Sequence, residues 1–456
     1  RYIRVTGVQT CALPILMSTL NNSDIENITV IKDAAAASLY GSRAANGVIL
    51  ISTKKGKSGK AQISLKADWG SNDFAMDYRP VMGGEERREY IYNGLILYQQ
   101  RKLADKNPNI SEEELMSQSK TYADGQIDKY APIPWCGFTD WNKELFQKGH
   151  HSTYEASLAG GSDKFKYYSS LSYMKQNGIV QGSGLERVTG RLNADFSATD
   201  KLTVGAKILF SNVNQSVYDE GFTYTSPFYS SRNWATPSDP VYNEDGSWNR
   251  KFIRKANDRN PKLSAEYDYK HEKMLRAFNT LYAEYEIIKN LKFKTTFSYD
   301  YTTVKGEKWY DPRTSNGEDE NGEVVRFPAP GYNSQTNPLV DDVDGAVKDN
   351  TKATRFFGSL YANWNITKDL LFRTTLGVDV RNKRRGYYCS ANSLDGEGKD
   401  SKSLKEHTIE SGITWENVLT YSKILGEHDF QIMGGTSTIY KSKEYTLASG
   451  KGQTYG

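Results

Sequence analysis

Long hydrophobic runs are missing from this sequence. No window approaches the roughly 18 consecutive apolar residues that a membrane-spanning helix needs, which excludes a helical membrane protein. Cysteine and histidine are scarce, at three and five in 456 residues. The spacing of Cys11, Cys136 and Cys389 fits neither a disulfide scaffold nor a metal knuckle. Nothing in these residues therefore points to a fold stabilised by disulfides or by a structural metal.

Strong charge and catalytic constellations are missing as well. The formal net charge is +4, from 59 basic and 55 acidic residues, which is too balanced to indicate a nucleic-acid partner. No carboxylate pair or Ser/His/Asp set stands out, so we predict no enzyme, no catalytic residue, no metal site and no cofactor. One exception stays open, because 318–322 (EDENG) and 341–345 (DDVDG) resemble calcium loops in composition. They lack the full spacing of such loops, and solvated turns are the alternative.

The sequence does contain runs of about 10 to 13 residues in which apolar and polar residues alternate with a period of two. This length is close to that of a strand that crosses a bilayer. In 201–211, one face carries Leu202, Val204, Ala206, Ile208 and Phe210. The other face carries mostly polar residues. Strands of this length with one apolar face are typical of transmembrane β-barrels, which hydropathy scans miss.

The connections between these runs are asymmetric. Three short polar turns each place an aromatic residue six positions before a leucine, so that both lie on one face; the aromatics are Phe196, Tyr285 and Trp364. Outward aromatics at tight turns are expected of an interfacial girdle. The opposite strand ends lead into long polar stretches near 213–272, 304–352 and 383–408. Short turns at one end and long loops at the other are typical of outer-membrane barrels.

Counting the runs predicts about eleven strands. They lie near 61–70, 152–160, 164–174, 187–197, 201–212, 273–287, 291–303, 354–366, 370–382, 410–422 and 428–440. Because single-chain bacterial barrels have even strand numbers, we interpret the chain as a fragment that stops within a barrel. A curved, open sheet with two unpaired edges is expected. The segment 84–103 predicts an amphipathic helix in the first long loop, placed to cap the barrel mouth or to contact a partner.

The segment 17–57 resembles the end of the plug domain in the SusC/RagA family of TonB-linked outer-membrane proteins. The motif comprises Lys32 and Asp33, a run of small residues, and Tyr40, Gly41, Ser42, Arg43, Ala44, Ala45, Asn46 and Gly47 before an apolar strand. GGSDKFKYYSSLSYMKQNGIV, ERVTGRLNADF and TWENVLTYSKILGEHDFQIMGG also resemble the family, in the same order. Read from the residues alone, 25–31 is a strand, Asp33 caps a short helix over 34–39, and 48–51 is a strand buried on both faces.

The resemblance implies a mainly β protein: an antiparallel transmembrane barrel, with about 11 of 22 strands in this chain, and the C-terminal part of an α+β plug. Residues 17–57 would belong to the plug, and 58–456 would form the first half of the barrel with long extracellular loops. Residues 1–16 are interpreted as non-native or are left unassigned. The implied function is import across the outer membrane, energised by a TonB-type protein and assisted by a SusD-like surface lipoprotein. Oligosaccharides are the favoured substrate, with peptides as a variant.

Two sets of site residues follow. Asp33, Tyr40, Gly41, Arg43, Asn46 and Gly47 form the plug motif, which we interpret as structural, with a substrate-facing role for Arg43 as the alternative. Tyr224, Trp234, Trp248, Trp309 and Tyr310 are candidate substrate contacts in the long loops, where rings can stack on sugars or hold peptides. The alternative for these aromatics is that they pack on one another and stiffen the loops. Two other classes stay open for the whole chain: a surface receptor or signal-transducing barrel, and a soluble carbohydrate-binding β protein.

Overall fold

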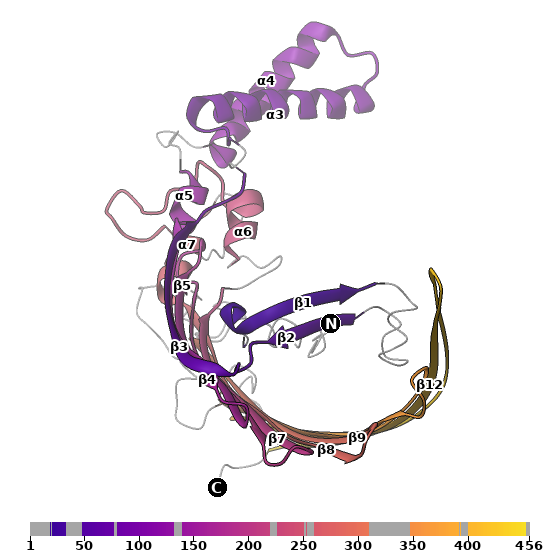
Figure 1. Ribbon diagram of the computed structural model, residues 1–456. Coiled ribbons are helices and arrows are strands. Elements are labelled where there is room, and N and C mark those ends of the chain that lie inside the picture. Colours follow the sequence, from indigo (N-terminus) through magenta and orange to yellow (C-terminus); the bar gives the residue numbers. More distant parts are fainter. Residues whose placement is uncertain are drawn as a thin grey trace.

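A computed structural model describes residues 19, 21–32, 48–76, 80–131, 139–218, 226–249, 252, 260–309, 347–391, 393 and 400–452. Two antiparallel sheets organise this part of the chain. One sheet has two strands and the other has eleven, and Figure 1 shows the small sheet lying inside the curve of the large one. We call them the inner sheet and the wall.

The wall pairs eleven strands in strict sequence order, so that each strand lies beside the next one along the chain. The strands are β3 (Gly59–Asn72), β4 (Gly149–Gly161), β5 (Phe165–Asn177), β6 (Gly184–Ser197), β7 (Leu202–Ser216), β8 (Tyr269–Ile288), β9 (Leu291–Trp309), β10 (Val347–Asn365), β11 (Leu370–Cys389), β12 (Lys402–Leu425) and β13 (His428–Lys451). Figure 1 shows an arc that does not close, and β3 and β13 are its edges. The predicted open, curved sheet is confirmed.

All eleven predicted wall strands are present, but most extend further toward the long loops than their alternation predicted. The expected loop at 383–408 is wrong at both ends, since β11 continues to Cys389 and β12 begins at Lys402. The backbone ladder continues there without interruption. Arg385 also forms an ion pair of 2.6 Å with Asp349 on β10. Paired charges stabilise this extension. The prediction missed it because it relied on the alternation of apolar residues.

The two faces of the wall differ as the alternation predicted. Large apolar side chains such as Leu281, Phe297 and Trp415 are exposed on the outer face. The turn aromatics Phe196, Tyr285 and Trp364 are also exposed. On the inner face, Ser211 is fully buried against neighbouring groups. An extended apolar outer surface of this kind marks contact with a membrane or another protein.

The inner sheet consists of β1 (Ile25–Ile31) and β2 (Val48–Thr53), preceded by the single-turn 3-10 helix η1 (Asn22–Asp24). Its strands pair antiparallel, with Val30 opposite Ile49. The expectation that 48–51 is buried on both faces is wrong, because Ile49 is 63% exposed and Leu50 is 40% exposed. The wall covers only the side of the sheet that faces it. Apolar residues on both faces therefore did not imply burial on both faces within this chain.

Apart from η1, the described helices belong to the segments that connect β3 to β4 and β7 to β8. α3 (Gly84–Lys106) confirms the helix predicted over 84–103, and it packs against α4 (Glu112–Tyr130), which the sequence pattern did not reveal. Figure 1 shows this hairpin extending away from the arc. The shorter helices are α5 (Trp141–Leu145), α6 (Pro227–Tyr229), the π-helix η3 (Ser230–Trp234) and α7 (Pro261–Tyr267). None of the helices in the described ranges is long and apolar enough to cross a membrane.

A small apolar core holds the loop segments together. It contains Trp141, Leu145, Phe146, Val180, Ala235, Val241 and Phe252. Trp141 donates a hydrogen bond from its indole N–H to the carbonyl oxygen of Thr236, over 3.0 Å. Segments that follow β3, β5 and β7 thus meet in one cluster. The loops at this end of the wall are ordered by packing on one another.

Candidate functional site at the junction of the inner sheet and the wall

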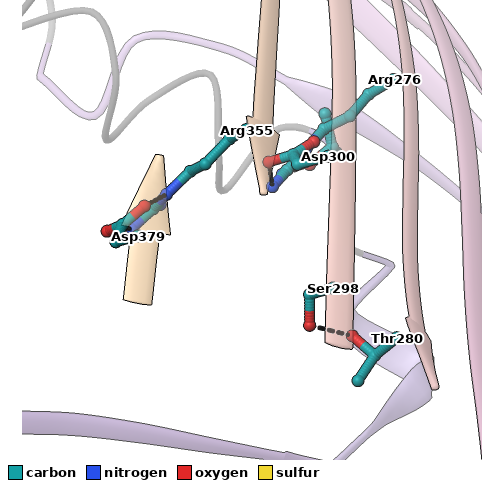
Figure 2. Close-up of polar contacts among 7 residues, drawn as sticks. Arg276, Thr280, Ser298, Asp300, Arg355 and Asp379 are labelled. Carbon is teal, nitrogen blue, oxygen red and sulfur yellow. Dashed lines mark hydrogen bonds and ion pairs between the residues drawn. The ribbon is translucent and has the colours of Figure 1, made fainter. Parts of the chain in front are cut away.

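A row of alternating charges crosses the inner face of four adjacent wall strands. Arg276 on β8, Asp300 on β9, Arg355 on β10 and Asp379 on β11 follow one another, and Figure 2 shows them in this order. Arg355 lies opposite Asp300 in the strand register. Because a one-residue slip would turn every side chain to the other face, the row exists only in this register.

Two arginine–carboxylate forks form this charged row. Arg276 donates from Nε and Nη2 to the two oxygens of Asp300, over 3.0 and 2.8 Å. Arg355 donates in the same way to Asp379, over 2.8 and 2.6 Å. Paired N–H donors match the geometry of a carboxylate, which makes such contacts shorter and stronger than neutral hydrogen bonds. The row therefore joins β8 to β9 and β10 to β11 through side chains as well as through the backbone.

Asp24, directly before β1, is the most enclosed charge at the junction. Its carboxylate accepts hydrogen bonds from the Tyr168 hydroxyl over 2.8 Å and from the Ser170 hydroxyl over 2.6 Å. It also accepts from Nε of Arg191 over 3.1 Å, and the two charged side chains are 2% and 8% exposed. A buried carboxylate is stable only when paired and hydrogen-bonded. Asp24 meets this condition through wall strands β5 and β6.

Two further contacts attach the segments that flank the inner sheet. Arg276 donates from Nη1 to the Thr19 hydroxyl over 2.9 Å, so the charged row also holds the chain before η1. Asn193 on β6 donates to the carbonyl oxygen of Lys54, over 2.7 Å. Lys54 in turn donates its backbone N–H to the carbonyl oxygen of Asp24, over 2.9 Å. The start and the end of the inner sheet are thus fastened to the same part of the wall.

A cavity of about 440 Å³ lies between the inner sheet and the wall. Ile51 and Thr53 of β2 line one side, and residues of β6 to β10 line the other. The wall residues that line it are Arg191, Lys207, Ile208, Leu209, Arg276, Phe278, Thr280, Ser298, Asp300, Arg355 and Phe357. On β8 and β9, Thr280 and Ser298 share a hydrogen bond of 2.8 Å, drawn in Figure 2. The site thus combines a fastened inner sheet with a largely apolar space behind it, whose charged lining residues are mainly cationic.

Sequence comparisons point to one group of proteins, although no family model matches the chain. The chain is 28% identical over 324 residues to "TonB-dependent receptor P3" of Formosa agariphila, a match that covers 70% of this chain and 28% of that protein. It is 31% identical over 234 residues to "TonB-dependent receptor SusC" of Bacteroides thetaiotaomicron, covering 50% of this chain and 19% of that protein. The chain therefore spans under a third of the length of these curated relatives.

The fold agrees with this grouping. The structure of the RagAB peptide importer in its closed-closed state superposes with a TM-score of 0.56 at 17% identity, covering 95% of this chain and 49% of that chain. A second structure, of the RagAB peptide transporter, gives 0.54 at 18% identity and covers 94% and 49%. At sequence identities this low, the structural similarity is evidence for a shared fold alone. The chain is similar to SusC/RagA-type TonB-dependent receptors.

The wall matches part of the β-barrel of such receptors, left open within this chain, and the inner sheet matches their plug-like part. The relatives named above are receptors and transporters, not enzymes. The six predicted plug-motif residues, from Asp33 to Gly47, lie outside the described residues. Their roles stay predictions. The contacts of Asp24 and Thr19 with the wall lie just upstream of that motif.

Only some of the predicted substrate contacts in the loops lie among the described residues. Tyr224 and Tyr310 lie outside the described residues. Trp234 ends η3 and Trp309 ends β9, so both occupy the long-loop side of the wall. Trp248 packs with its ring centroid 4.6 Å from that of Tyr242. Since Trp248 also adjoins the apolar loop core, packing between aromatics accounts for its position, and its contact with substrate stays a prediction.

The turn that carries Trp248 is expected to depend on pH through Asp245. The Ser247 hydroxyl, which donates over 2.6 Å, and the Ser247 N–H lower the pKa of the Asp245 carboxyl below its ordinary value of 3.8. A carboxyl whose folded pKa is depressed stabilises the fold above its unfolded pKa and loses that effect as pH falls through the folded pKa. We expect the turn to loosen below about pH 4.

A 5-fluorotryptophan label, assigned through Trp248→Phe and followed by ¹⁹F NMR, would report the change. The expected result is a shift of the Trp248 resonance as pH falls below that value, and loss of this titration in Asp245→Asn. Glu244→Gln is the matched control, because Glu244 is the preceding exposed carboxylate. A titration that disappears equally in both variants would contradict the assignment to Asp245.

Metal binding has no support within the described ranges. There, no three His, Cys, Asp or Glu side chains lie close enough together to hold a metal ion. Both predicted calcium-like loops, 318–322 and 341–345, lie outside those ranges, and calcium binding there stays a prediction.

Sequence reasoning missed the residues that fasten the inner sheet, chiefly Asp24, Arg191 and Arg276. A signal for Arg276 was present, because Arg276 and Asp300 lie on the polar faces of neighbouring predicted strands. Pairing the strands through their short turn would have placed these charges near each other. Asp24 had no such signal, since its wall partners are 144 to 167 positions away in the sequence.

Proposed function

We propose that the chain supplies the plug-like end and part of the barrel wall of a TonB-dependent importer in the outer membrane. The observation that carries the proposal is the wall itself: a continuous sheet with an exposed apolar outer face and a charged inner face to which the inner sheet is fastened. An apolar band facing lipid and a polar interior are the arrangement that spanning barrels require. The proposed role is transport and not catalysis.

The proposed partners are a TonB-type energy-transducing protein and a SusD-like surface lipoprotein, as the family resemblance implies. Energy transduction must then act on the plug-like part, which Asp24, Thr19 and Lys54 connect to the wall. We propose oligosaccharides as the substrate class, because the long loops are rich in aromatics suited to stacking on sugars. Peptides are the alternative, favoured by the fold likeness to the RagAB peptide importer.

Uptake by living cells tests this function. Cells that express the intact gene are expected to accumulate at least one fluorescent oligosaccharide at least tenfold faster than deletion cells, and a protonophore should abolish the difference. A parallel arm with labelled peptides separates the two substrate classes. The control is a sugar small enough for general porins, whose uptake should be equal in all strains.

Equal uptake of every oligosaccharide and peptide with and without the gene would contradict the transport proposal. Loss of a transcriptional response to substrate, with uptake unchanged, would favour a signalling receptor instead. Recovery of the protein in the soluble fraction, without detergent, would favour a soluble carbohydrate-binding protein.

A further inference from the structure

The cavity between β2 and the wall is unusually rich in positive charge. Four cationic side chains line it, Arg191, Lys207, Arg276 and Arg355, whereas Asp300 is the one acidic residue among its described lining residues. Its volume, about 440 Å³, is within the roughly 300–1,000 Å³ of small-molecule sites. The charge and the size together suit a small anionic group.

The three arginines are already neutralised by carboxylates. Arg191 pairs with Asp24, Arg276 with Asp300, and Arg355 with Asp379. Each of these contacts also serves to hold two strands or the inner sheet together. The arginines therefore give the cavity its shape and offer little unpaired charge to a ligand.

Lys207 is different. In the described part of the chain it has no hydrogen-bond or ion-pair partner, and its Nζ lies 5.9 Å from the ring centroid of Tyr282. The acidic group that attracts it, Asp195, already accepts a hydrogen bond of 2.5 Å from the Tyr282 hydroxyl. Lys55, Lys294 and Arg191 surround it with further positive charge. A half-buried ammonium without a counter-ion is costly, and a ligand carboxylate would relieve that cost.

The rest of the lining suits a sugar ring. Phe278 on β8, with the Arg276 guanidinium over its ring, and Phe357 on β10 supply aromatic side chains, and the hydroxyls of Thr280 and Ser298 supply donors and acceptors. Sugars are bound by this mixture of ring faces and hydroxyl partners. A peptide carboxylate shares the charge but does not need two aromatic faces. The lining thus favours an acidic sugar over an acidic peptide.

We propose that this cavity binds the carboxylate of an acidic, uronate-containing oligosaccharide on its way past the plug-like part, with Lys207 as the charged contact. The inference rests on the proposed import of oligosaccharides and adds their chemical class. Binding here would place substrate against Ile51 and Thr53 of β2, which the same wall strands fasten. Substrate charge would then be sensed next to the contacts that hold the inner sheet in position.

Calorimetry on the intact protein, purified in detergent, tests this site. The probes are an oligogalacturonate and a neutral maltooligosaccharide of the same length. Lys207→Gln is expected to weaken oligogalacturonate binding about tenfold, because one charge-assisted contact is lost, and to leave neutral-sugar binding unchanged. Lys207→Arg should retain most of the affinity. Raising the salt concentration should weaken wild-type binding more than that of Lys207→Gln.

Lys383→Gln is the matched control, since Lys383 lies on the same inner face of the wall but outside the cavity. Equal weakening by the two glutamine variants, or absence of oligogalacturonate binding to the wild type, would overturn the proposal. If Lys207→Gln weakened the binding of a triglutamate peptide but not that of oligogalacturonate, the choice of a sugar as the ligand would be overturned. The protein could import neutral oligosaccharides equally well with and without Lys207→Gln and bind no acidic sugar. That result would refute this inference and leave the proposed function intact. Absence of all uptake would refute both.

Discussion

Replacing Asp24 with alanine is expected to lower the free energy of unfolding of the detergent-solubilised protein by about 3 to 5 kcal/mol. The Asp24 and Arg191 side chains are 2% and 8% exposed, so the substitution leaves Arg191 as a buried charge without its carboxylate. Tyr168 and Ser170 lose their acceptor as well. The measurement is denaturant unfolding followed by near-ultraviolet circular dichroism.

Limited trypsin digestion gives a second readout for Asp24→Ala. Lys54, Lys55 and Lys57 follow the inner sheet directly, and release of the sheet should speed cleavage there. Glu26→Ala is the control, because Glu26 lies on β1 two residues away and is exposed. Its expected effect is below about 0.5 kcal/mol. Equal stability of Asp24→Ala and Glu26→Ala would show that the Asp24 cluster does not hold the inner sheet.

Replacing Arg276 with alanine is the second large effect, an expected loss of about 3 kcal/mol. The substitution leaves Asp300, whose side chain is 18% exposed, without its arginine, and it removes the hydrogen bond to Thr19. It thus weakens both the β8–β9 contact and the attachment of the chain before η1. The same unfolding measurement applies.

Arg381→Ala is the control for that change. Arg381 lies 3.8 Å from Glu410 in a pair whose side chains are both 42% exposed, and such pairs contribute about 0 to 1 kcal/mol. A loss for Arg276→Ala no larger than for Arg381→Ala would contradict the structural role of the charged row. A double substitution, Arg276→Met with Asp300→Leu, should recover part of the stability, because it leaves no buried charge unpaired.

Much of the wall could be predicted, because the sequence patterns that define its strands and turns span only a few neighbouring residues. Alternation over 201–211 assigned the faces of β7, and the short turn after Ile288 fixed which strand follows β8. Helix α3 was predicted from its composition, whereas α4 was missed, because few apolar residues of α4 mark a buried stripe. The far ends of β11 and β12 were missed because paired charges such as Arg385 and Asp349 extend them.

The candidate site was far less accessible to sequence reasoning. The sequence showed which residue types lie on the polar faces. Which charges pair depends on the strand register and on side chains that contact residues other than their direct register partners. Arg276 reaches Asp300 although its register partner on β9 is Thr302. The cavity depends further on where β2 lies against the wall, for which no short-range pattern exists.

The sequence by itself determined the resemblance of this protein to a receptor family, the order of its wall strands and the face that each side chain occupies. These features follow from a two-residue period and from turns between neighbouring strands, which act over a few positions of the chain. Only the tertiary structure decided which charges pair, how Asp24 fastens the inner sheet, and that Lys207 has no ion-pair partner among the described residues. Those outcomes depend on groups that are far apart in the chain and that folding brings together. Because a buried charge without a partner is unfavourable in free energy, arrangements in which the charges pair are favoured.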